Sequence, residues 1–255
     1  MNKETQKSKT HFGFQQIASE NKSTKVKEVF DNVVEGYVLM NDLLSFGIHR
    51  IWKRIAVEMS GIRPGSFVLD LAGGTGDMVK LMAPKLNKEG MIILSDINKK
   101  MLSLGRDKLL DSGINNFNAL QIDGQLLPFK EGSFDLISIA FGLRNVEDIK
   151  KCLNSIFQSL KPGGKLLVLE FSQPSNEIIR ELYDLYSFEI IPKLGEIVLS
   201  SEESYQYLAE SIRMHPKQDK LKNLFEECGF KDCEYENLTN GVVAIHTGKK
   251  PKSYE

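Results

Sequence analysis

The 255-residue sequence lacks several features that would assign it to a specialised class of protein. Its three cysteines are odd in number and show no CxxC spacing, so neither a disulfide framework nor a zinc knuckle is indicated. The four histidines are far apart and show no HExxH pattern, so no metal site is expected: His11, His49, His215 and His246. No window approaches about 18 uninterrupted apolar residues, so any contact with a bilayer would be peripheral.

Charge and targeting signals exclude further classes. The sequence has 33 basic and 34 acidic residues, so its net charge of -1 gives no general electrostatic reason to expect nucleic acid or an anionic membrane. The N-terminal segment mixes lysines with glutamates and contains no long apolar run, which argues against a signal peptide or membrane anchor. We therefore expect a cytoplasmic protein with one large α/β domain.

Hydrophobic patterns predict alternating strands and helices through the middle of the chain. Strands are expected at 67–71, 91–95, 117–122, 134–140 and 165–171, and intervening helices at 77–86, 100–112 and 147–160. Such alternation predicts a mostly parallel sheet that helices cover on both faces.

The predicted domain spans residues 23–248. It begins with helices within 23–60, has an aromatic-rich helical insertion at 174–215, and ends with a helix at 217–228 and a hairpin joined through Asn240-Gly241. We expect a loose N-terminal segment at 1–22, in which Phe12 and Phe14 could dock on the domain, and a loose tail at 249–255.

A glycine-rich loop follows the first central strand. Residues Val68 to Asp77 read VLDLAGGTGD, a buried strand entering a tight turn where backbone can approach a ligand closely. The third glycine of a GxGxxG dinucleotide motif is replaced by Val79, so NAD or FAD fits poorly. Asp96 follows the second strand, where a carboxylate can accept hydrogen bonds from ribose, and Asp123 with Gly124 follows the third, where they could meet an adenine edge.

An aspartate at a strand end is also common as a helix cap or turn residue, so no single one of these positions decides the ligand. Together they resemble the class I S-adenosylmethionine-dependent methyltransferases. Longer motifs resemble the C-methyltransferases of ubiquinone and menaquinone biosynthesis, and they are YVLMNDLLSFGIHRIWKR (37–54), FGLRNVED (141–148), LKPGGKLLVLEFS (160–172) and SYQYLAESIRMHP (204–216). The resemblance extends from about Thr10 to about Gly248.

The resemblance implies a Rossmann-like fold with a mostly parallel seven-stranded sheet, a terminal hairpin and a helical cap. It implies C-methylation of a polyprenylated demethyl-benzoquinol, a demethylmenaquinol or both, with S-adenosylmethionine as methyl donor. The stretch THFGF at 10–14 resembles members on the ubiquinone side. The residues implied to contact the donor or shape its loop are Thr75, Asp96, Asp123, Gly124, Gly73, Gly74 and Gly76.

The sequence departs from the family pattern at several positions. Val38 stands where the family usually has Asp, which puts a role for that carboxylate in doubt. Asp123-Gly124 stands where Asn-Ala is common, which is compatible with the wider class. Ala140 often corresponds to Ser, so one hydroxyl contact is removed. None of these changes removes the donor pocket.

Methyl transfer to an aromatic carbon requires an electron-rich ring, so the enzyme must stabilise a developing phenolate. Arg144 could supply a permanent positive charge, whereas its high pKa excludes it as the base. His49 or a water could take the proton, and Asn145 and Asn41 could orient the ring. The alternative roles are a surface ion pair for Arg144 and a capping or packing role for His49.

Other functions stay open on the sequence. The chain could methylate another small lipid or phenol, or could be a catalytically silent scaffold of a quinone-biosynthesis complex. A nicotinamide dehydrogenase is disfavoured by Val79, and nucleic-acid methylation by the neutral charge and the lack of an NPPY-type motif. The expected partner is a prenylated quinol. A homodimer, a biosynthetic complex and peripheral contact with the inner membrane remain open.

Overall fold

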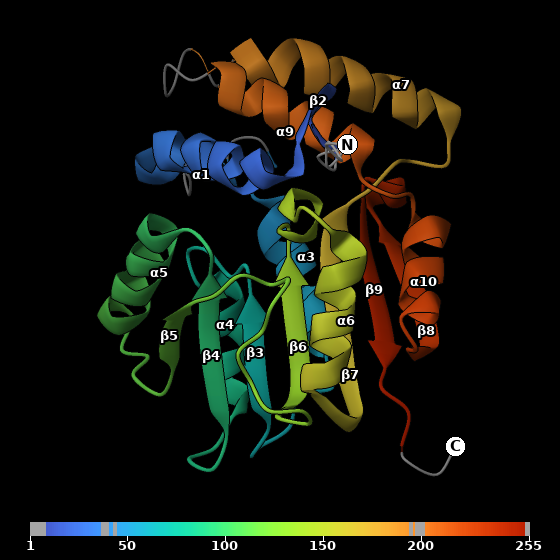
Figure 1. Ribbon diagram of the computed structural model, residues 1–255. Coiled ribbons are helices and arrows are strands. Elements are labelled where there is room, and N and C mark those ends of the chain that lie inside the picture. Colours follow the sequence, from blue (N-terminus) through green and yellow to red (C-terminus); the bar gives the residue numbers. More distant parts are fainter. Residues whose placement is uncertain (1–8, 37–40, 43–44, 194–195, 197–201, 253–255) are drawn as a thin grey trace, which may run out of the picture.

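The computed structural model describes residues 9–36, 41–42, 45–193, 196 and 202–252. Its centre is a seven-stranded sheet with the order β5-β4-β3-β6-β7-β9-β8, in which only β9 runs antiparallel to its neighbours (Figure 1). The predicted sheet with its terminal hairpin is confirmed. The strands are β3 Phe67–Leu71, β4 Met91–Asp96, β5 Asn118–Gln121, β6 Phe134–Ala140, β7 Leu160–Phe171, β8 Lys231–Leu238 and β9 Val243–Lys249.

Helices cover both faces of this sheet, and others lie over the carboxyl ends of its parallel strands (Figure 1). The longer helices are α1 Lys22–Val33, α3 Ile48–Met59, α4 Asp77–Met82, α5 Lys99–Asp111, α6 Ile149–Ser159, α7 Glu177–Leu185, α9 Glu202–Met214 and α10 Gln218–Glu227. The single turns are η1 Ser19–Asn21, η2 Val34–Gly36, η3 Ala83–Lys85, η4 Leu143–Asn145, η6 Thr239–Gly241 and the π-helical turn η5 Tyr186–Ile190. None of the described helices is both long enough and apolar enough to cross a bilayer.

Strand β3 shows why the sheet forms at this place in the chain. Successive side chains of a strand point to opposite faces, so an apolar run can enter two cores. Leu69 and Leu71 pack in a cluster with residues of α6 and α10, whereas Val68 packs with residues of α3 and α4. Because both faces are covered, the run needs no polar alternation.

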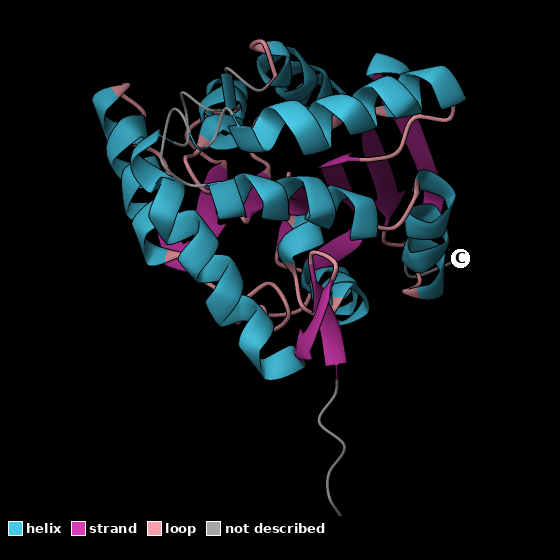
Figure 2. Cartoon of the chain, turned by 90° about the horizontal axis from the view of Figure 1, so that it is seen from above, coloured by secondary structure: helices cyan, strands magenta, loops and turns pink. Residues whose placement is uncertain are grey.

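The segment between Pro174 and His215 forms most of a helical cap. Figure 1 shows α1, α7 and α9 above the end of the sheet toward which β6 points, and Figure 2 shows these helices from above. A small buried cluster joins the N-terminal helix to the insertion. It contains Val33 of α1, Tyr205 of α9 and Ile191, which precedes α9 in the chain. The predicted helical cap over the strand ends is confirmed.

The prediction of a loose segment at 1–22 is wrong for residues 9–22. Strands β1 Lys9–Phe12 and β2 Gln15–Ala18 form an antiparallel hairpin, η1 follows, and Lys22 begins α1. The hairpin is held by partners on α9, nearly two hundred residues further along the chain, so local composition could not reveal it. Residues 1–8 lie outside the described part of the chain.

The tail prediction also needs correction. Strand β9 extends to Lys249, and the backbone of Lys250 pairs with Gly163 and Gly164 at distances of 2.8 and 2.9 Å between nitrogen and oxygen. The predicted start of the fifth strand at residue 165 differs as well, because β7 begins at Leu160 and passes through the glycine turn. Backbone hydrogen bonds therefore hold Lys249 and Lys250 in place, although their polar side chains gave no sign of it in the sequence.

Candidate active site

The glycine-rich loop after β3 leads into α4 at the carboxyl end of the sheet. Ala72, Gly74 and Gly76 all have positive φ, at 54°, 50° and 78°, so the chain turns tightly here. A Cβ on Gly73 would lie 2.5 Å from Oδ2 of Asp70, which leaves no room for a side chain. The backbone itself is therefore the surface that this loop presents.

Gly105 on α5 is a second requirement of this loop, and sequence analysis missed it. A Cβ at Gly105 would lie 2.3 Å from the carbonyl oxygen of Gly74 and 3.0 Å from the carbonyl carbon of Thr75. The bare backbone lets α5 pack directly on the loop. A glycine inside a predicted helix was the available signal, because such a residue costs helix stability and often marks close packing.

Asp96 ends β4 and holds the loop in place. Its Oδ2 accepts a hydrogen bond from the backbone N–H of Gly74 at 2.9 Å, and its Oδ1 accepts one from Asn98 at 2.8 Å. Burial raises the pKa of this carboxyl to about 6. The predicted acid after the second strand therefore contacts the glycine loop directly.

Asp70 is a buried acid within the VLDLAGGTGD stretch, and sequence analysis assigned it no role. It has no exposed surface, and its Oδ1 accepts a hydrogen bond from the Ser138 hydroxyl at 2.8 Å. Its Oδ2 is buried with no partner among the described residues, and burial raises the pKa of the carboxyl to about 7. A single acid in an otherwise apolar strand was the signal, because such a group is costly to bury.

A cavity of about 360 Å³ lies over the carboxyl ends of the strands. Nearly all of the predicted site residues line it, and these are Asn41, His49, Gly73, Gly74, Thr75, Asp96, Asp123, Gly124, Arg144 and Asn145. Gly76 differs, because it caps the start of α4 behind the loop. A Cβ on Gly76 would lie 2.9 Å from Cδ1 of Leu109, so its role is packing as well as conformation.

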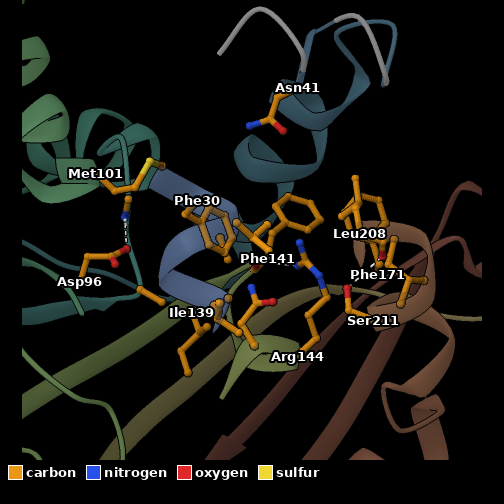
Figure 3. A pocket seen from close by; sticks show the side chains of 18 of the residues that line it. Phe30, Asn41, Asp96, Met101, Ile139, Phe141, Arg144, Phe171, Leu208 and Ser211 are labelled. Carbon is orange, nitrogen blue, oxygen red and sulfur yellow. Dashed lines mark hydrogen bonds between the residues drawn. The ribbon is translucent and has the colours of Figure 1, made fainter. Parts of the chain in front are cut away.

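The cavity has two ends of different character. Figure 3 shows Asp96 and Met101 on one side and Arg144, Leu208 and Ser211 on the other, with Ile139 and Phe141 between them. The first end is bounded by the glycine loop. The second is bounded by η4 and the cap, from which Tyr183, Tyr186 and Tyr205 also line the cavity. One end is polar and formed by backbone, whereas the other is largely aromatic.

Arg144 forms a buried ion pair, which differs from the surface ion pair considered as its alternative. Its Nη1 donates to Oε1 of Glu170 at 2.7 Å and to the carbonyl of Phe141 at 2.5 Å. Glu170, at the end of β7, is 1% exposed and also accepts from the backbone N–H of Arg144. The Nε of Arg144 is buried without a partner among the described residues. Glu170 was missed because it is distant in sequence, although it interrupts an apolar strand.

His49 forms a dyad with Asp42, a residue that sequence analysis did not single out. Nε2 of His49 lies 2.7 Å from Oδ1 of Asp42, and Arg50 binds both oxygens of the same carboxylate. The Arg50 hydrogen bond lowers the pKa of Asp42 to about 2, so Asp42 is ionised near pH 7. Burial lowers the pKa of His49, and its Nδ1 has no partner among the described residues.

Asn145 and Ala140 also line the cavity, and Ala140 is one of the positions that depart from the family pattern. The Tyr207 hydroxyl donates to Oδ1 of Asn145 at 3.1 Å, a contact from the cap that the sequence did not reveal. Ala140 lines the cavity, so a serine there would add a hydroxyl to it. Val38 lies outside the described residues.

Comparison with known proteins decides the family. The model of the ubiE/COQ5 methyltransferase family matches residues 18–250. The chain belongs to this family. It is 54% identical over 242 residues to a ubiquinone/menaquinone biosynthesis C-methyltransferase UbiE of Methylococcus capsulatus, covering 94% of this chain and 98% of the relative. It is 51% identical over 251 residues to the UbiE of Shewanella sediminis, covering 98% and 100%.

Solved structures share the fold of this ubiE/COQ5 family member at low sequence identity. The [4+2]-cyclase SpnF is 14% identical with a TM-score of 0.67, covering 91% of this chain and 97% of the other. A SAM dependent methyltransferase from Aquifex aeolicus is 14% identical with a TM-score of 0.58, covering 78% and 89%. A cyclase among these structures illustrates that the fold alone does not determine the reaction.

Family membership confirms the predicted enzyme class, a C-methyltransferase that uses S-adenosylmethionine as methyl donor. The dehydrogenase alternative is thereby set aside. The individual roles of the site residues remain predictions.

Proposed function

We propose that this ubiE/COQ5 family member transfers a methyl group to a ring carbon of a prenylated, demethylated quinol of the benzoquinol or naphthoquinol type. The proposal is supported by the high identity to full-length relatives that are named for ubiquinone and menaquinone biosynthesis. The observation that carries it is the two-ended cavity, in which a backbone loop with Asp96 lies opposite a buried arginine within an aromatic wall.

The residues at the loop end fit S-adenosylmethionine, which when bound supplies an electrophilic methyl group. Asp96 accepts backbone hydrogen bonds from Gly74 and Asn98 on its two oxygens, and as an acceptor-only carboxylate with about four lone pairs it can also accept from ribose hydroxyls. Gly73 and Gly74 leave their backbone uncovered by side chains, so the loop can contact the donor closely, and Asp123 with Gly124 would contact its adenine.

His49 is the proposed base for the quinol hydroxyl. Because Asp42 is ionised, it accepts the Nε2–H of neutral His49 and fixes the tautomer in which Nδ1 carries a lone pair. The lowered pKa of His49 keeps the ring neutral near pH 7, as a proton acceptor must be. The proton would move from the quinol oxygen to Nδ1.

Arg144 is the proposed group that stabilises the resulting phenolate. Glu170 holds its Nη1 side, so the guanidinium has a fixed orientation and a fixed charge. Its Nε, which has no partner among the described residues, is one donor left for an acceptor oxygen. Asn145, and Asn41 on the N-terminal side, would hydrogen-bond the second oxygen of the ring. The methyl group would pass from the donor sulfur to the ring carbon, and the proton on that carbon would leave to water. The proton held on Nδ1 of His49 would then return to the ring oxygen, which restores the hydroxyl group.

The aromatic end of the cavity would hold the ring and the start of its prenyl tail. Tyr183 and Tyr186 line the cavity on the inner side of the cap, together with Ile191 and Leu208. Burial raises the pKa of Tyr183 to about 12, so this phenol stays neutral and adds no competing charge. Such a wall suits an apolar acceptor.

The exposed face of α7 supports peripheral contact with a bilayer. Ile178, Leu182 and Leu185 are 69%, 63% and 58% exposed and fall on one face of α7. Tyr183 on the same helix lines the cavity, so a lipid acceptor would pass from the bilayer to the site around α7. Glu181 beside this face is exposed, and Glu177 is paired with Arg180, so the face has no excess positive charge to attract anionic headgroups and favours apolar contact with neutral lipid.

An acceptor panel tests the proposal. Purified protein and labelled S-adenosylmethionine are incubated with a prenylated demethyl-benzoquinol, a demethylmenaquinol, an unprenylated phenol and a phospholipid. The proposal predicts transfer to one or both prenylated quinols. Preferred transfer to the phenol or phospholipid would support the alternative lipid or phenol enzyme, and donor binding with no transfer to any acceptor would support the scaffold.

A further inference from the structure

The N-terminal hairpin is attached to the cap at its turn. Gly13 has a φ of 56°, and a Cβ there would lie only 2.1 Å from Oε2 of Glu210 on α9. That oxygen instead accepts a hydrogen bond from the backbone N–H of Phe14 at 3.0 Å. Gln206 donates to the other oxygen of Glu210 at 2.9 Å. The turn therefore has a fixed position on α9.

The ring of Phe12 lies between the first helix and the cap. It stacks on Tyr207 of α9 with the ring centroids 4.3 Å apart and an angle of 19° between the planes. Nζ of Lys25 on α1 lies 5.3 Å from the centroid of the Phe12 ring. Contacts of this kind restrict the orientation of the tyrosine ring.

Tyr207 carries this contact to the cavity. Its hydroxyl donates to Oδ1 of Asn145 at 3.1 Å, and Asn145 lines the cavity beside Arg144. Tyr207 is buried, and burial raises the pKa of its hydroxyl, so the group stays protonated as a donor. With its oxygen engaged, Asn145 presents its amide N–H groups to a ligand.

We propose that Phe12 is a positioning residue of the active site, which orients the amide of Asn145 through the ring and hydroxyl of Tyr207. The inference rests on the proposed function, in which Asn145 hydrogen-bonds an oxygen of the acceptor ring. The hairpin thereby becomes part of the acceptor site although it contacts no acceptor. When the residue that holds a substrate-binding group in place is removed, the substrate is less well positioned and the reaction becomes slower.

Kinetics of paired variants test this inference. Phe12→Ala is expected to lower kcat for the quinol roughly tenfold with an unchanged Kd for S-adenosylmethionine, because a small misplacement at a reacting centre has a large effect on rate. Phe12→Tyr, which keeps the stacked ring, should restore the rate. Phe14→Ala is the matched control, since the Phe14 ring packs on Phe188 instead, and it should leave kcat within about twofold of wild type.

A double-mutant cycle separates positioning from general stabilisation. If Phe12 acts through the Tyr207 hydroxyl, Phe12→Ala should cause no further loss of kcat in a Tyr207→Phe background. A full additional loss in that background, or wild-type kinetics of Phe12→Ala, overturns the inference. Phe12→Leu, which retains apolar volume, replaces Phe12→Ala throughout if the alanine variant does not fold.

A measurement without turnover separates this inference from the proposed function. The side-chain amide NMR signals of Asn145, assigned with Asn145→Asp, should move in Phe12→Ala or its leucine substitute and stay in place in Phe14→Ala. Unchanged signals in the Phe12 variant overturn the inference even if the wild type methylates quinols. If the wild type methylates no quinol, the proposed function fails and the NMR result alone decides whether Phe12 positions Asn145.

Discussion

At the scale of single residues, Asp96 does two things at once. It anchors the backbone of Gly74 and offers its remaining lone pairs to a ribose. Asp96→Ala should therefore weaken S-adenosylmethionine binding by about 100-fold, since hydrogen bonds to a charged group each contribute about 2 kcal/mol. Isothermal titration calorimetry measures this, with Asp111→Ala as an exposed control at the far end of α5. An unchanged affinity would remove Asp96 from the donor site.

Arg144 is expected to act on rate rather than on donor binding. Truncating Arg144 alone would leave Glu170 buried and unpaired, which costs stability, so the informative variant is the double substitution Arg144→Ala with Glu170→Gln. We expect this variant to keep the donor affinity and to lose about 100-fold in kcat, the typical loss when a group that stabilises a developing anion is removed. Arg106→Ala, at an exposed ion pair, is the control. Near-normal turnover would make Arg144 structural.

The buried side chain of His215 should lower the stability of the protein in acid. It is buried with both ring nitrogens unpartnered among the described residues, and burial lowers its pKa from 6.5 to about 4. Glu170 favours the protonated form, whereas Arg144, His246 and Lys22 oppose it. The unfolded chain takes up this proton below pH 6.5 and the folded chain does not, so acidification from 6.5 toward 4 removes stability.

Urea unfolding of wild type and His215→Gln at pH 7 and pH 5 checks this prediction. The free energy of unfolding of wild type should fall by about 2 kcal/mol more than that of the variant over this interval, because each pKa unit corresponds to about 1.4 kcal/mol. Asp70 and Asp96, whose pKa values are raised, titrate in both proteins and cancel in the difference. An equal fall in both proteins would contradict the account.

At the scale of elements, α7 links the cavity to the surface. The triple variant Ile178→Ser, Leu182→Ser, Leu185→Ser removes its exposed apolar face and should abolish cosedimentation with phosphatidylcholine vesicles. Leu110→Ser with Leu120→Ser, exposed leucines elsewhere on the molecule, should have no effect. Adding anionic lipid should not strengthen binding.

Two results would count against the role of α7. One is vesicle binding by the triple variant at the level of wild type. The other is a dimer in solution that the triple variant dissociates, as light scattering would detect, because the apolar face would then be covered by a second copy of the chain.

Elements with strong local patterns could be predicted from sequence to the residue. Strands β3 at Phe67–Leu71 and β6 at Phe134–Ala140 have the predicted bounds, because apolar runs bounded by turn residues decide them. The hairpin β1–β2 could not be predicted, because its order depends on Glu210 and Tyr207. The site shows the same difference. The glycine loop could be predicted because it is contiguous in sequence, whereas Glu170 and Asp42 become the partners of Arg144 and His49 only in the fold.

At the scale of the whole molecule, the sheet supplies the donor end of the cavity and the cap supplies the acceptor end. Family membership establishes the methyltransferase class, and the aromatic second end is what points to a quinol ring. The whole account therefore depends on whether a methyl group reaches a ring carbon of that acceptor.

The most direct measurement is the position of the transferred methyl group. Protein is incubated with S-adenosylmethionine that carries a ¹³C-labelled methyl group and with the prenylated demethyl-quinol that the acceptor panel favours, and the product is examined by NMR and mass spectrometry. The account predicts one labelled methyl on a ring carbon, with both hydroxyl groups still free. A methyl ether, or no labelled product although the donor binds, would contradict it.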